Sequence, residues 1–320
     1  MNITCVISSL GSGGAERVIS RLANAWVAEG HRVEMLTLEA SEPFYALDPR
    51  ITLRQLGVAG NSRSVPEAIA SNLRRLWALR VAIRAHRPDV IVSFTDATNV
   101  RVLMAAVGLR IPTIVSERTD PAHSRMGRVW EFLRERFYPR ADLLVMQTQR
   151  AAAFFPRLQQ KIRIIPNPVP APTSVAEAKP AGTRKQLVTL GRLHREKGFD
   201  LLMTAFREVA GRHPDWDITI WGEGPARAEL ERLRNELGLT ERVHLPGTTT
   251  EAHAKLAAAD LYVLSSRFEG FPNGLCEAMA TGVPVVSFDC ANGPAEIITP
   301  ELDGVLVPAE DTRALAEALD

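Results

Sequence analysis

The sequence predicts an α/β protein of two doubly wound, Rossmann-like domains that face each other across a cleft. Short apolar runs alternate with helical patterns in both halves of the chain, which is typical of βαβ units with a parallel sheet. This alternation stops at residues 166–186, which are rich in Pro, Ala and Lys, and then restarts. A length of 320 residues is about twice that of a typical domain, which also favours two domains.

Residues 1–165 form the predicted N-terminal domain. Its expected strands are Ile3–Ser8, Arg32–Leu38, Val90–Ser93, Thr113–Ser116 and Leu143–Gln147, and its clearest helical patterns are Ala15–Glu29, Glu67–Arg87 and Asn99–Val107. Residues 166–186 have no apolar period and form the predicted linker.

Residues 187–320 form the predicted C-terminal domain. Its expected strands are Leu187–Leu190, Asp217–Trp221, Val243–Leu245, Leu261–Leu264, Pro284–Ser287 and Val305–Val307. The last ten residues have a helical pattern with no cap, glycine or polar tail, so we expect this domain to lack its final helices.

Charge is distributed unevenly along the chain. Residues 1–170 carry 23 Lys and Arg against 14 Asp and Glu, a net charge of +9, whereas residues 171–320 carry 15 against 23, or −8. This polarity indicates that the N-terminal half faces an anionic partner, such as a membrane surface or a phosphorylated acceptor. The alternative is a GC-rich genome that favours arginine.

Other features of the composition exclude whole classes of protein. No apolar stretch is long enough to cross a bilayer, and the N-terminus lacks the basic region of a signal peptide. The three cysteines are widely spaced without a CxxC pair, which favours reduced thiols over a disulfide or a zinc site. We therefore expect a cytoplasmic protein without a nucleic-acid partner, and a peripheral position at the inner face of the cell membrane is compatible with its charge.

The helical pattern at Glu67–Arg87 does not predict a clean membrane-surface helix. At about 100° per residue, Arg80 and Arg84 fall near the apolar face that carries Leu73 and Trp77 rather than opposite it. Arginine stems packed around a half-buried apolar stripe explain the pattern equally well.

The first candidate binding residues follow the strand Leu187–Leu190. The segment GRLHREKGFD places Arg192 and Lys197 between this strand and the next helix, at the carboxyl end of a parallel strand. Two cations beside a helix N-terminus suit a diphosphate. The alternative is a pair of basic residues in an ordinary surface loop.

A second segment, RFEGFPNGLCE, follows the apolar run LYVLSS and is more specific. Glu269 lies in its Gly- and Pro-rich loop, and Glu277 lies about one turn into a helix that starts near Asn273. Such a carboxylate can accept hydrogen bonds from two vicinal hydroxyls of a ribose or a sugar. A helix-dipole role explains Glu277 alone but leaves Glu269 unexplained. The backbone amides that could bind phosphate oxygens are those of Asn273, Gly274 and Leu275.

These segments together resemble the retaining family-4 glycosyltransferases of GT-B fold that make bacterial envelope or lipid-linked glycans. The stretch EGFPNGLCEAMATGVPVV resembles the family's signature of two glutamates, and GRLHREKGFDLL resembles its phosphate loop. WGEGPARAELE, GGAERV and IRIIPNPV match further family elements, and their order spans nearly the whole chain.

The resemblance implies transfer of a hexose or N-acetylhexosamine from a nucleotide-diphosphate sugar, with UDP preferred, to a glycan or polyprenyl-linked acceptor. The sugar's configuration would be retained, the N-terminal domain would lie on the acceptor side, and neither a metal nor a cofactor is expected. An epimerase of the same fold, a decayed non-catalytic transferase and an NAD-dependent oxidoreductase are the alternatives. The oxidoreductase fingerprint GxGxxG fails because Glu16 stands where glycine or alanine is needed.

The resemblance also assigns roles to residues of the C-terminal domain. Arg192 and Lys197 would neutralise the leaving diphosphate, Glu277 would hold the ribose hydroxyls, and Glu269 would bind the transferred sugar. The donor-side residues expected in the first N-terminal loop are Gly13 and Gly14.

The N-terminal domain departs from the family pattern after the strand Thr113–Ser116. Many members carry a histidine here, whereas this chain continues Glu117-Arg118-Thr119-Asp120. We expect Arg118 to contact the donor sugar or its phosphates, and Glu117 or Asp120 to contact the acceptor. Asp96, which follows the strand Val90–Ser93, is a further acceptor-side candidate. Ordinary loop charges remain the alternative for each of them.

Overall fold

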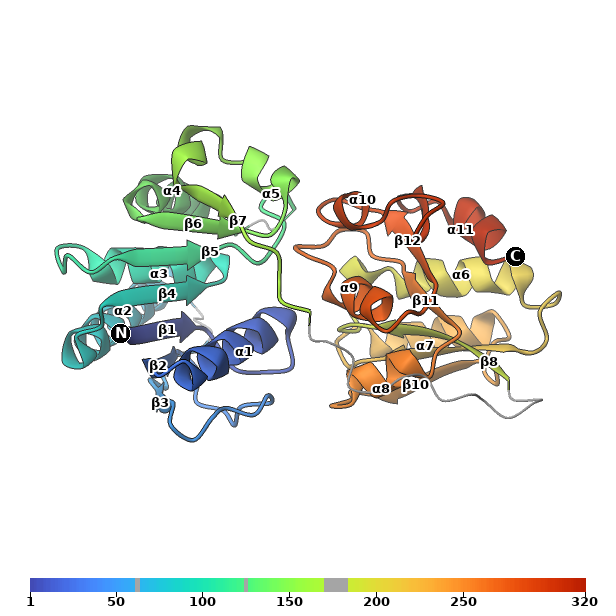
Figure 1. The fold of residues 1–320 in the computed structure, drawn as a ribbon, viewed down its shortest axis with the longest axis horizontal. Coiled ribbons are helices and arrows are strands. Elements are labelled where there is room, and N and C mark those ends of the chain that lie inside the picture. Colours follow the sequence, from blue (N-terminus) through green and yellow to red (C-terminus); the bar gives the residue numbers. More distant parts are fainter. Residues whose placement is uncertain (61–63, 124–125, 170–183) are drawn as a thin grey trace. The chain divides into compact units, whose positions relative to one another are not determined.

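The computed structural model describes residues 1–60, 64–123, 126–169 and 184–320. The chain divides into two compact units, unit 1 at Met1–Asn167 and unit 2 at Pro168–Asp320 (Figure 1). Each unit contains one parallel sheet covered by helices on both faces, so the predicted doubly wound α/β class is confirmed. The linker predicted at 166–186 lies mostly outside the described residues.

Unit 1 contains a seven-stranded parallel sheet with the order β3-β2-β1-β4-β5-β6-β7. Its strands are β1 (Asn2–Ile7), β2 (Arg32–Thr37), β3 (Thr52–Gln55), β4 (Val90–Phe94), β5 (Thr113–Ser116), β6 (Leu143–Met146) and β7 (Ile162–Ile164). The five predicted strands are confirmed, and the two that the sequence pattern missed, β3 and β7, are the edge strands. Edge strands are short and largely exposed here, so they lack the continuous apolar run of a buried parallel strand.

The helices of unit 1 cover both faces of its sheet (Figure 1). Its helical elements are α1 (Gly14–Ala28), α2 (Val65–His86), α3 (Asp96–Ala106), α4 (Arg128–Phe137), η1 (Tyr138–Arg140), α5 (Gln149–Ala153) and η2 (Pro156–Lys161). Successive side chains of a strand point to opposite faces. Cys5 accordingly packs in the cluster formed with α1, whereas the next residue, Val6, packs in the cluster formed with α2 and α3.

Unit 2 contains a six-stranded parallel sheet with the order β10-β9-β8-β11-β12-β13. All six predicted strands are confirmed, as β8 (Lys185–Leu190), β9 (Trp216–Trp221), β10 (Val243–Gly247), β11 (Leu261–Leu264), β12 (Val285–Asp289) and β13 (Val305–Pro308). Its helical elements are η3 (Arg195–Lys197), α6 (Phe199–Val209), α7 (Arg227–Glu236), α8 (Ala252–Ala257), α9 (Asn273–Ala280), α10 (Pro294–Ile297) and α11 (Thr312–Leu319).

The strand orders determine which loops are neighbours. In unit 2 the chain leaves β8 toward β9 on one side and later returns to β11 on the other, so β8 and β11 flank a topological switch point. In unit 1 the corresponding strands are β1 and β4. Ligands of open α/β sheets bind beyond the carboxyl ends of the strands at such points. The loops after β8 and β11 carry the strongest sequence candidates.

Candidate active site

Lys197 and Glu269 form an ion pair at the switch point of unit 2. Lys197 ends η3, after β8, and its Nζ lies 2.7 and 2.8 Å from the two carboxylate oxygens of Glu269, in the loop after β11. Ser266 Oγ donates a second hydrogen bond to Glu269 Oε1, at 2.6 Å. The resemblance assigned these two side chains to different parts of a substrate, and the structure brings them together.

Arg192, the other predicted phosphate ligand, is exposed. Its Nη2 lies 3.1 Å from Glu196 Oε1, and 63% of its side chain is accessible to solvent. Exposed ion pairs of this kind contribute little to stability. Arg192 can therefore leave Glu196 for an anionic ligand at a small cost in free energy.

Gly198 forces the turn that follows Lys197. Its φ of +61° lies in the left-handed region, and an added Cβ would stand 2.0 Å from the carbonyl oxygen of Ser265. Only glycine combines this backbone conformation with so close an approach to the loop after β11. The turn begins α6 directly after the lysine.

The start of α9 packs against Tyr262, a buried residue of β11. An added Cβ on Gly274 would lie 2.5 Å from Tyr262 Oη. Burial, and then the charges of Glu269 and Glu277, raise the pKa of Tyr262 well above its ordinary value. A neutral phenol thus lies within electrostatic reach of both glutamates of the signature. Nothing in the sequence indicated that Tyr262 lies beside these two glutamates, because it belongs to an otherwise apolar strand.

The predicted helix start at Asn273 is confirmed, but hydrogen bonds at this start occupy backbone amides that were expected to bind phosphate. The Asn273 amide donates to Phe271 O at 2.9 Å, and the Leu275 amide donates to Pro272 O at 3.1 Å. The Leu275 side chain is fully buried in the core, and Glu277 is 3% exposed. Two of the three amides expected to face phosphate are thus hydrogen-bonded within the chain.

In unit 1, Gly13 and Gly14 start α1 directly beyond the central strand β1. Gly13 is the N-cap residue and Gly14 the first helical residue. Glu16 lies in the first turn, and Ser9 Oγ donates to its Oε1 at 3.4 Å. A carboxylate is favourable at the positive end of a helix dipole. The residue that breaks the dinucleotide fingerprint therefore suits the N-terminus of α1.

Glu117 is buried at the carboxyl end of β5. It accepts hydrogen bonds from Tyr138 Oη at 2.7 Å and from Thr119 Oγ1 at 3.2 Å, and only 2% of it is exposed. Burial first, and the charge of Asp96 second, raise the pKa of Glu117 to about 7. The structure thus buries this acceptor-side candidate inside unit 1. With a pKa of about 7, its protonated and ionised forms are both populated near neutral pH.

The remaining candidates in this loop also contact their own unit. Asp120 is 3% exposed and accepts from the Ala122 amide at 2.9 Å. The Arg118 guanidinium lies 3.8 Å from the centroid of the Phe94 ring and donates to Asn167 Oδ1. Burial lowers the pKa of Arg118 to about 9, which leaves it charged at neutral pH. Asp96, the first residue of α3, accepts from the amide of the next residue at 2.7 Å.

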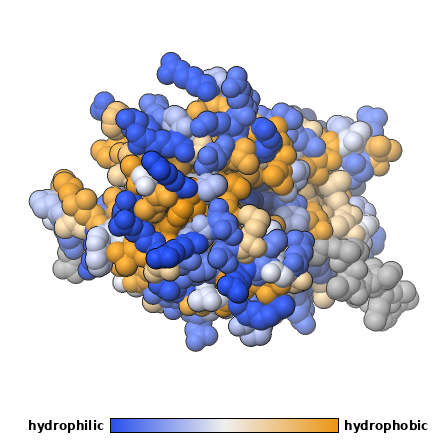
Figure 2. All heavy atoms as spheres, turned by 60° about the vertical axis from the view of Figure 1, so that its left-hand side comes forward, coloured by the Kyte–Doolittle hydropathy of each residue, from blue (hydrophilic) through white to orange (hydrophobic). Residues whose placement is uncertain are grey.

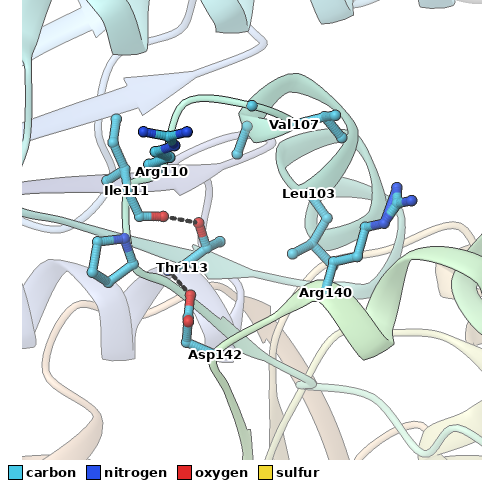
Figure 3. A pocket seen from close by; sticks show the side chains of 10 residues that line it. Leu103, Val107, Arg110, Ile111, Thr113, Arg140 and Asp142 are labelled. Carbon is cyan, nitrogen blue, oxygen red and sulfur yellow. Dashed lines mark hydrogen bonds between the residues drawn. The ribbon is translucent and has the colours of Figure 1, made fainter.

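A cavity of about 420 Å³ lies beside the opposite ends of the strands in the sheet of unit 1 (Figure 3). Its walls include Arg110 and Arg140, and Asp142 accepts a hydrogen bond from the Thr113 amide at 2.8 Å in its floor. Since Thr113 begins β5, this cavity opens at the amino ends of the strands. It contains none of the candidate residues.

The described part of the chain offers neither a cluster of metal ligands nor a membrane-spanning helix. In residues 1–60, 64–123, 126–169 and 184–320, no group of three or more His, Cys, Asp or Glu side chains is placed to hold a metal ion. Within the same part of the chain, every helix is too short or too polar to cross a bilayer.

Comparison with known proteins decides the family. Residues 12–171 match the family described as Glycosyltransferase Family 4, and residues 184–320 match Glycosyl transferases group 1. The chain belongs to the family-4 glycosyltransferases. The two family matches confirm the resemblance seen in the sequence, and the oxidoreductase alternative is wrong.

Relatives of known role cover nearly the whole enzyme. It is 30% identical to an α-1,4-N-acetyl-D-galactosaminyltransferase of Campylobacter jejuni, named for a diNAcBac-PP-undecaprenol acceptor, over 100% of this chain and 88% of the relative. It is 29% identical to the lipopolysaccharide core biosynthesis glycosyltransferase LpsD of Rhizobium meliloti, over 96% of this chain and 84% of the relative.

Solved structures establish the GT-B fold of the enzyme. Anabaena HepE in complex with UDP and glucose superposes with a TM-score of 0.77 at 19% identity, over 98% of this chain and 88% of HepE. The lipopolysaccharide outer core galactosyltransferase WaaB superposes with a TM-score of 0.74 at 21% identity, over 100% of this chain and 89% of WaaB. At these identities the likeness concerns the fold alone.

Proposed function

We propose that the enzyme transfers a hexose or N-acetylhexosamine from a UDP-sugar to a polyprenyl-linked glycan acceptor in envelope glycan synthesis, with retention of configuration. The observation that carries this proposal is the Lys197–Glu269 pair at the switch point of unit 2. It combines a cation for the departing diphosphate with a carboxylate for sugar hydroxyls.

The cations supply the main catalytic effect in this proposal. When the bond between the sugar's anomeric carbon and the phosphate oxygen breaks, negative charge grows on the β-phosphate. Arg192 and Lys197 stabilise that charge more in the transition state than in the ground state. Lys197 then exchanges part of its contact with Glu269 for a phosphate oxygen, and Glu269 becomes available to the sugar. Because two cations already serve the leaving group, we propose that transfer needs no metal ion.

Retention follows if the acceptor attacks on the face from which the diphosphate leaves. The acceptor hydroxyl oxygen forms the new bond to the anomeric carbon, and its proton passes to the leaving phosphate oxygen. On this route no side chain acts as a nucleophile. Glu277, Gly13, Gly14, Arg118 and Gly274 at the start of α9 bind the donor, while Asp96, Glu117 and Asp120 shape the acceptor side.

Two lines of support favour UDP and a lipid-linked acceptor. The structurally similar HepE and a structurally similar Staphylococcus aureus TarM variant were both solved with UDP. The Campylobacter relatives are named for undecaprenol-linked acceptors. A polyprenyl-linked acceptor lies in a membrane, so the enzyme needs a surface that reaches one.

The outer face of α2 offers such a surface. Large apolar side chains are exposed along α2 at a spacing of four residues, and two more are exposed on α4: Val65, Ile69, Leu73, Trp77, Val81, Val129 and Phe132. Figure 2, which turns unit 1 toward the viewer, shows apolar side chains reaching the surface among hydrophilic ones. The helix pattern that seemed ambiguous in the sequence therefore exposes apolar residues in the structure.

Arg101 of α3 contacts both α2 and α4. Its Nε donates to Asn72 Oδ1 of α2 at 3.3 Å, and its guanidinium lies 4.5 Å from the Trp130 ring centroid of α4. Exposed arginines such as Arg74 and Arg84 accompany the apolar side chains on α2. Apolar and basic groups on one face suit an anionic bilayer, and we propose that this face docks there.

Vesicle sedimentation tests the docking face. We expect binding to phosphatidylglycerol vesicles to exceed binding to phosphatidylcholine vesicles, and Leu73→Ser with Trp77→Ser to abolish it. Leu302→Ser, which removes an exposed apolar side chain of unit 2, is the control. Equal binding to both vesicle types, or full binding by the double variant, would overturn the proposal.

A thermal-shift panel tests the donor. UDP-, GDP- and ADP-sugars are compared with NAD, and the donor that stabilises the enzyme is then incubated with lipid-linked acceptors for product analysis by NMR. We expect stabilisation by a UDP-sugar and an α-linked product that forms equally well in EDTA. Stabilisation by another nucleotide alone, an inverted product or loss of activity in EDTA would contradict the corresponding part of the proposal.

A further inference from the structure

Arg267 makes an unusually dense set of contacts two residues before Glu269. Its Nη1 and Nη2 donate to the two carboxylate oxygens of Asp200 at 2.8 and 2.7 Å, and its Nε donates to Glu310 Oε2 at 3.0 Å. Nη1 also donates to Arg195 O at 2.8 Å, and only 15% of the side chain is exposed. The guanidinium therefore joins η3, the first turn of α6 and the loop after β13.

The loop after β11 holds three successive carbonyls of η3. Arg195 O accepts from the Arg267 guanidinium, Glu196 O accepts from the Arg267 amide at 2.8 Å, and Lys197 O accepts from Ser265 Oγ at 3.0 Å. The last carbonyls of a short helix have few partners inside it. Here Arg195 O also accepts from the Gly198 amide at 3.2 Å, and the segment that carries Glu269 supplies further donors to the turn that carries Lys197.

We propose that Arg267 is a positioning residue for Lys197 and that it acts on catalysis only through that ammonium group. This inference rests on the proposed role of Lys197 at the leaving diphosphate. Arg267 holds η3 against the loop that carries Glu269, so the Lys197 ammonium is already in place where charge develops on the leaving diphosphate. Misplacement of a catalytic group by about 1 Å lowers a rate by roughly 100-fold.

The contacts explain why arginine occupies this position. A planar guanidinium binds the Asp200 carboxylate with two parallel hydrogen bonds and still has donors for Arg195 O and Glu310, whereas an ammonium cannot match that geometry. Burial acts to raise the pKa of Asp200, but the hydrogen bonds and charge of Arg267 outweigh it, and the pKa lies below its ordinary value. Asp200 is thus a charged anchor at neutral pH.

A double-mutant cycle tests the proposal, with UDP release from UDP-N-acetylgalactosamine, or from the donor that the panel selects, as the readout. In the wild-type background we expect Arg267→Ala and Arg267→Lys to lower kcat by about 100-fold, with little change in KM. In the Lys197→Ala background we expect Arg267→Ala to lower kcat by less than about twofold, because the group it positions is gone. Methylguanidine should restore part of the kcat of Arg267→Ala but not of Arg267→Lys.

Arg184→Lys provides a matched control. Arg184 also binds a carboxylate with two hydrogen bonds, to Asp217 at 2.6 and 2.7 Å, but it lies at the amino ends of the strands of unit 2. We expect its kcat to stay at the wild-type value.

The outcomes separate this inference from the proposed function. A kcat of Arg267→Lys within about twofold of wild type, or additive effects in the cycle, would overturn the positioning role and leave the role of Lys197 standing. An unchanged kcat in Lys197→Ala alone would overturn both.

Discussion

The charged residues at the carboxyl ends of the strands have different surroundings in the two sheets. In unit 2, side chains of opposite charge form salt bridges, as in the pair of Lys197 with Glu269 and that of Arg267 with Asp200. In unit 1, Glu117 is enclosed with a tyrosine hydroxyl, and its pKa is raised to about 7. Both edges follow the same topology, so the difference comes from what packs around each side chain.

This contrast fits a division of labour between donor and acceptor chemistry. A diphosphate leaving group needs cations that are charged and already in place. A neutral acceptor hydroxyl makes no such demand, so the loop after β5 can use its carboxyl groups to hold its own shape. On our proposal, the loop after β5 in unit 1 recognises an acceptor by its shape, and the loops of unit 2 stabilise the negative charge of the leaving diphosphate.

The largest effect is expected from Lys197→Ala. We expect kcat to fall by about 100- to 1,000-fold with a smaller change in donor affinity, because the lost charge acts mainly in the transition state. Steady-state kinetics of UDP release measure it. Lys185→Ala, which removes an exposed lysine at the start of β8, is the control and should keep its kcat. A wild-type kcat for Lys197→Ala would remove the main distinction between the two edges.

Glu117→Gln tests the other side of the contrast. Because the pKa of Glu117 is raised in the folded state, the native protein holds a proton that the unfolded chain releases between pH 4.5 and 7. The free energy of unfolding should therefore fall by roughly 3 kcal/mol as pH rises through this window. Glu117→Gln should lose that dependence.

Urea unfolding of the wild type and Glu117→Gln at several pH values between 4 and 8 measures the effect. Glu135→Gln, at an exposed position of α4, serves as the control and should keep the wild-type dependence. Parallel curves for Glu117→Gln and the wild type would show that the pKa of this carboxyl group is not raised in the folded protein.

Gly274→Ala tests how tightly the donor edge is packed. The added methyl group would meet Tyr262 Oη at 2.5 Å, so we expect a loss of about 1–3 kcal/mol in the free energy of unfolding. Tyr262→Phe removes the opposing oxygen and should recover most of that loss in the double variant. Gly211→Ala, where an added Cβ has no neighbour within 4 Å, is the control for thermal unfolding. A double variant no more stable than Gly274→Ala would contradict this contact.

The smallest effect is expected from Glu196→Gln. It removes the half-buried partner of the exposed Arg192, so we expect the free energy of unfolding to change by less than about 1 kcal/mol. Because Arg192 no longer needs to leave a carboxylate, the KM for the donor should fall slightly. Urea unfolding and initial rates at varied donor concentration measure the two quantities. A larger loss of stability would show that Arg192 belongs to the folded framework.

The sequence alone determined the class of fold, eleven of the thirteen strands found in the described residues, and the position of Arg192, Lys197 and Glu269 after the ends of strands. These features depend on local apolar runs and on glycines at tight turns, which a sequence displays directly. It also showed Lys197 in a segment that resembles the family's phosphate loop and Glu269 in a segment that resembles its two-glutamate signature.

Only the tertiary structure showed that Lys197 and Glu269 contact each other across 72 positions of sequence, and that Arg267 donates a hydrogen bond to the turn that carries Lys197. Only the structure buried Glu117 against Tyr138 and left Trp77 exposed on α2. The edge strands β3 and β7 likewise gained their conformation from a neighbouring strand rather than from their own pattern. Burial and pairing depend on which distant segments pack together, and a local sequence pattern does not contain that information.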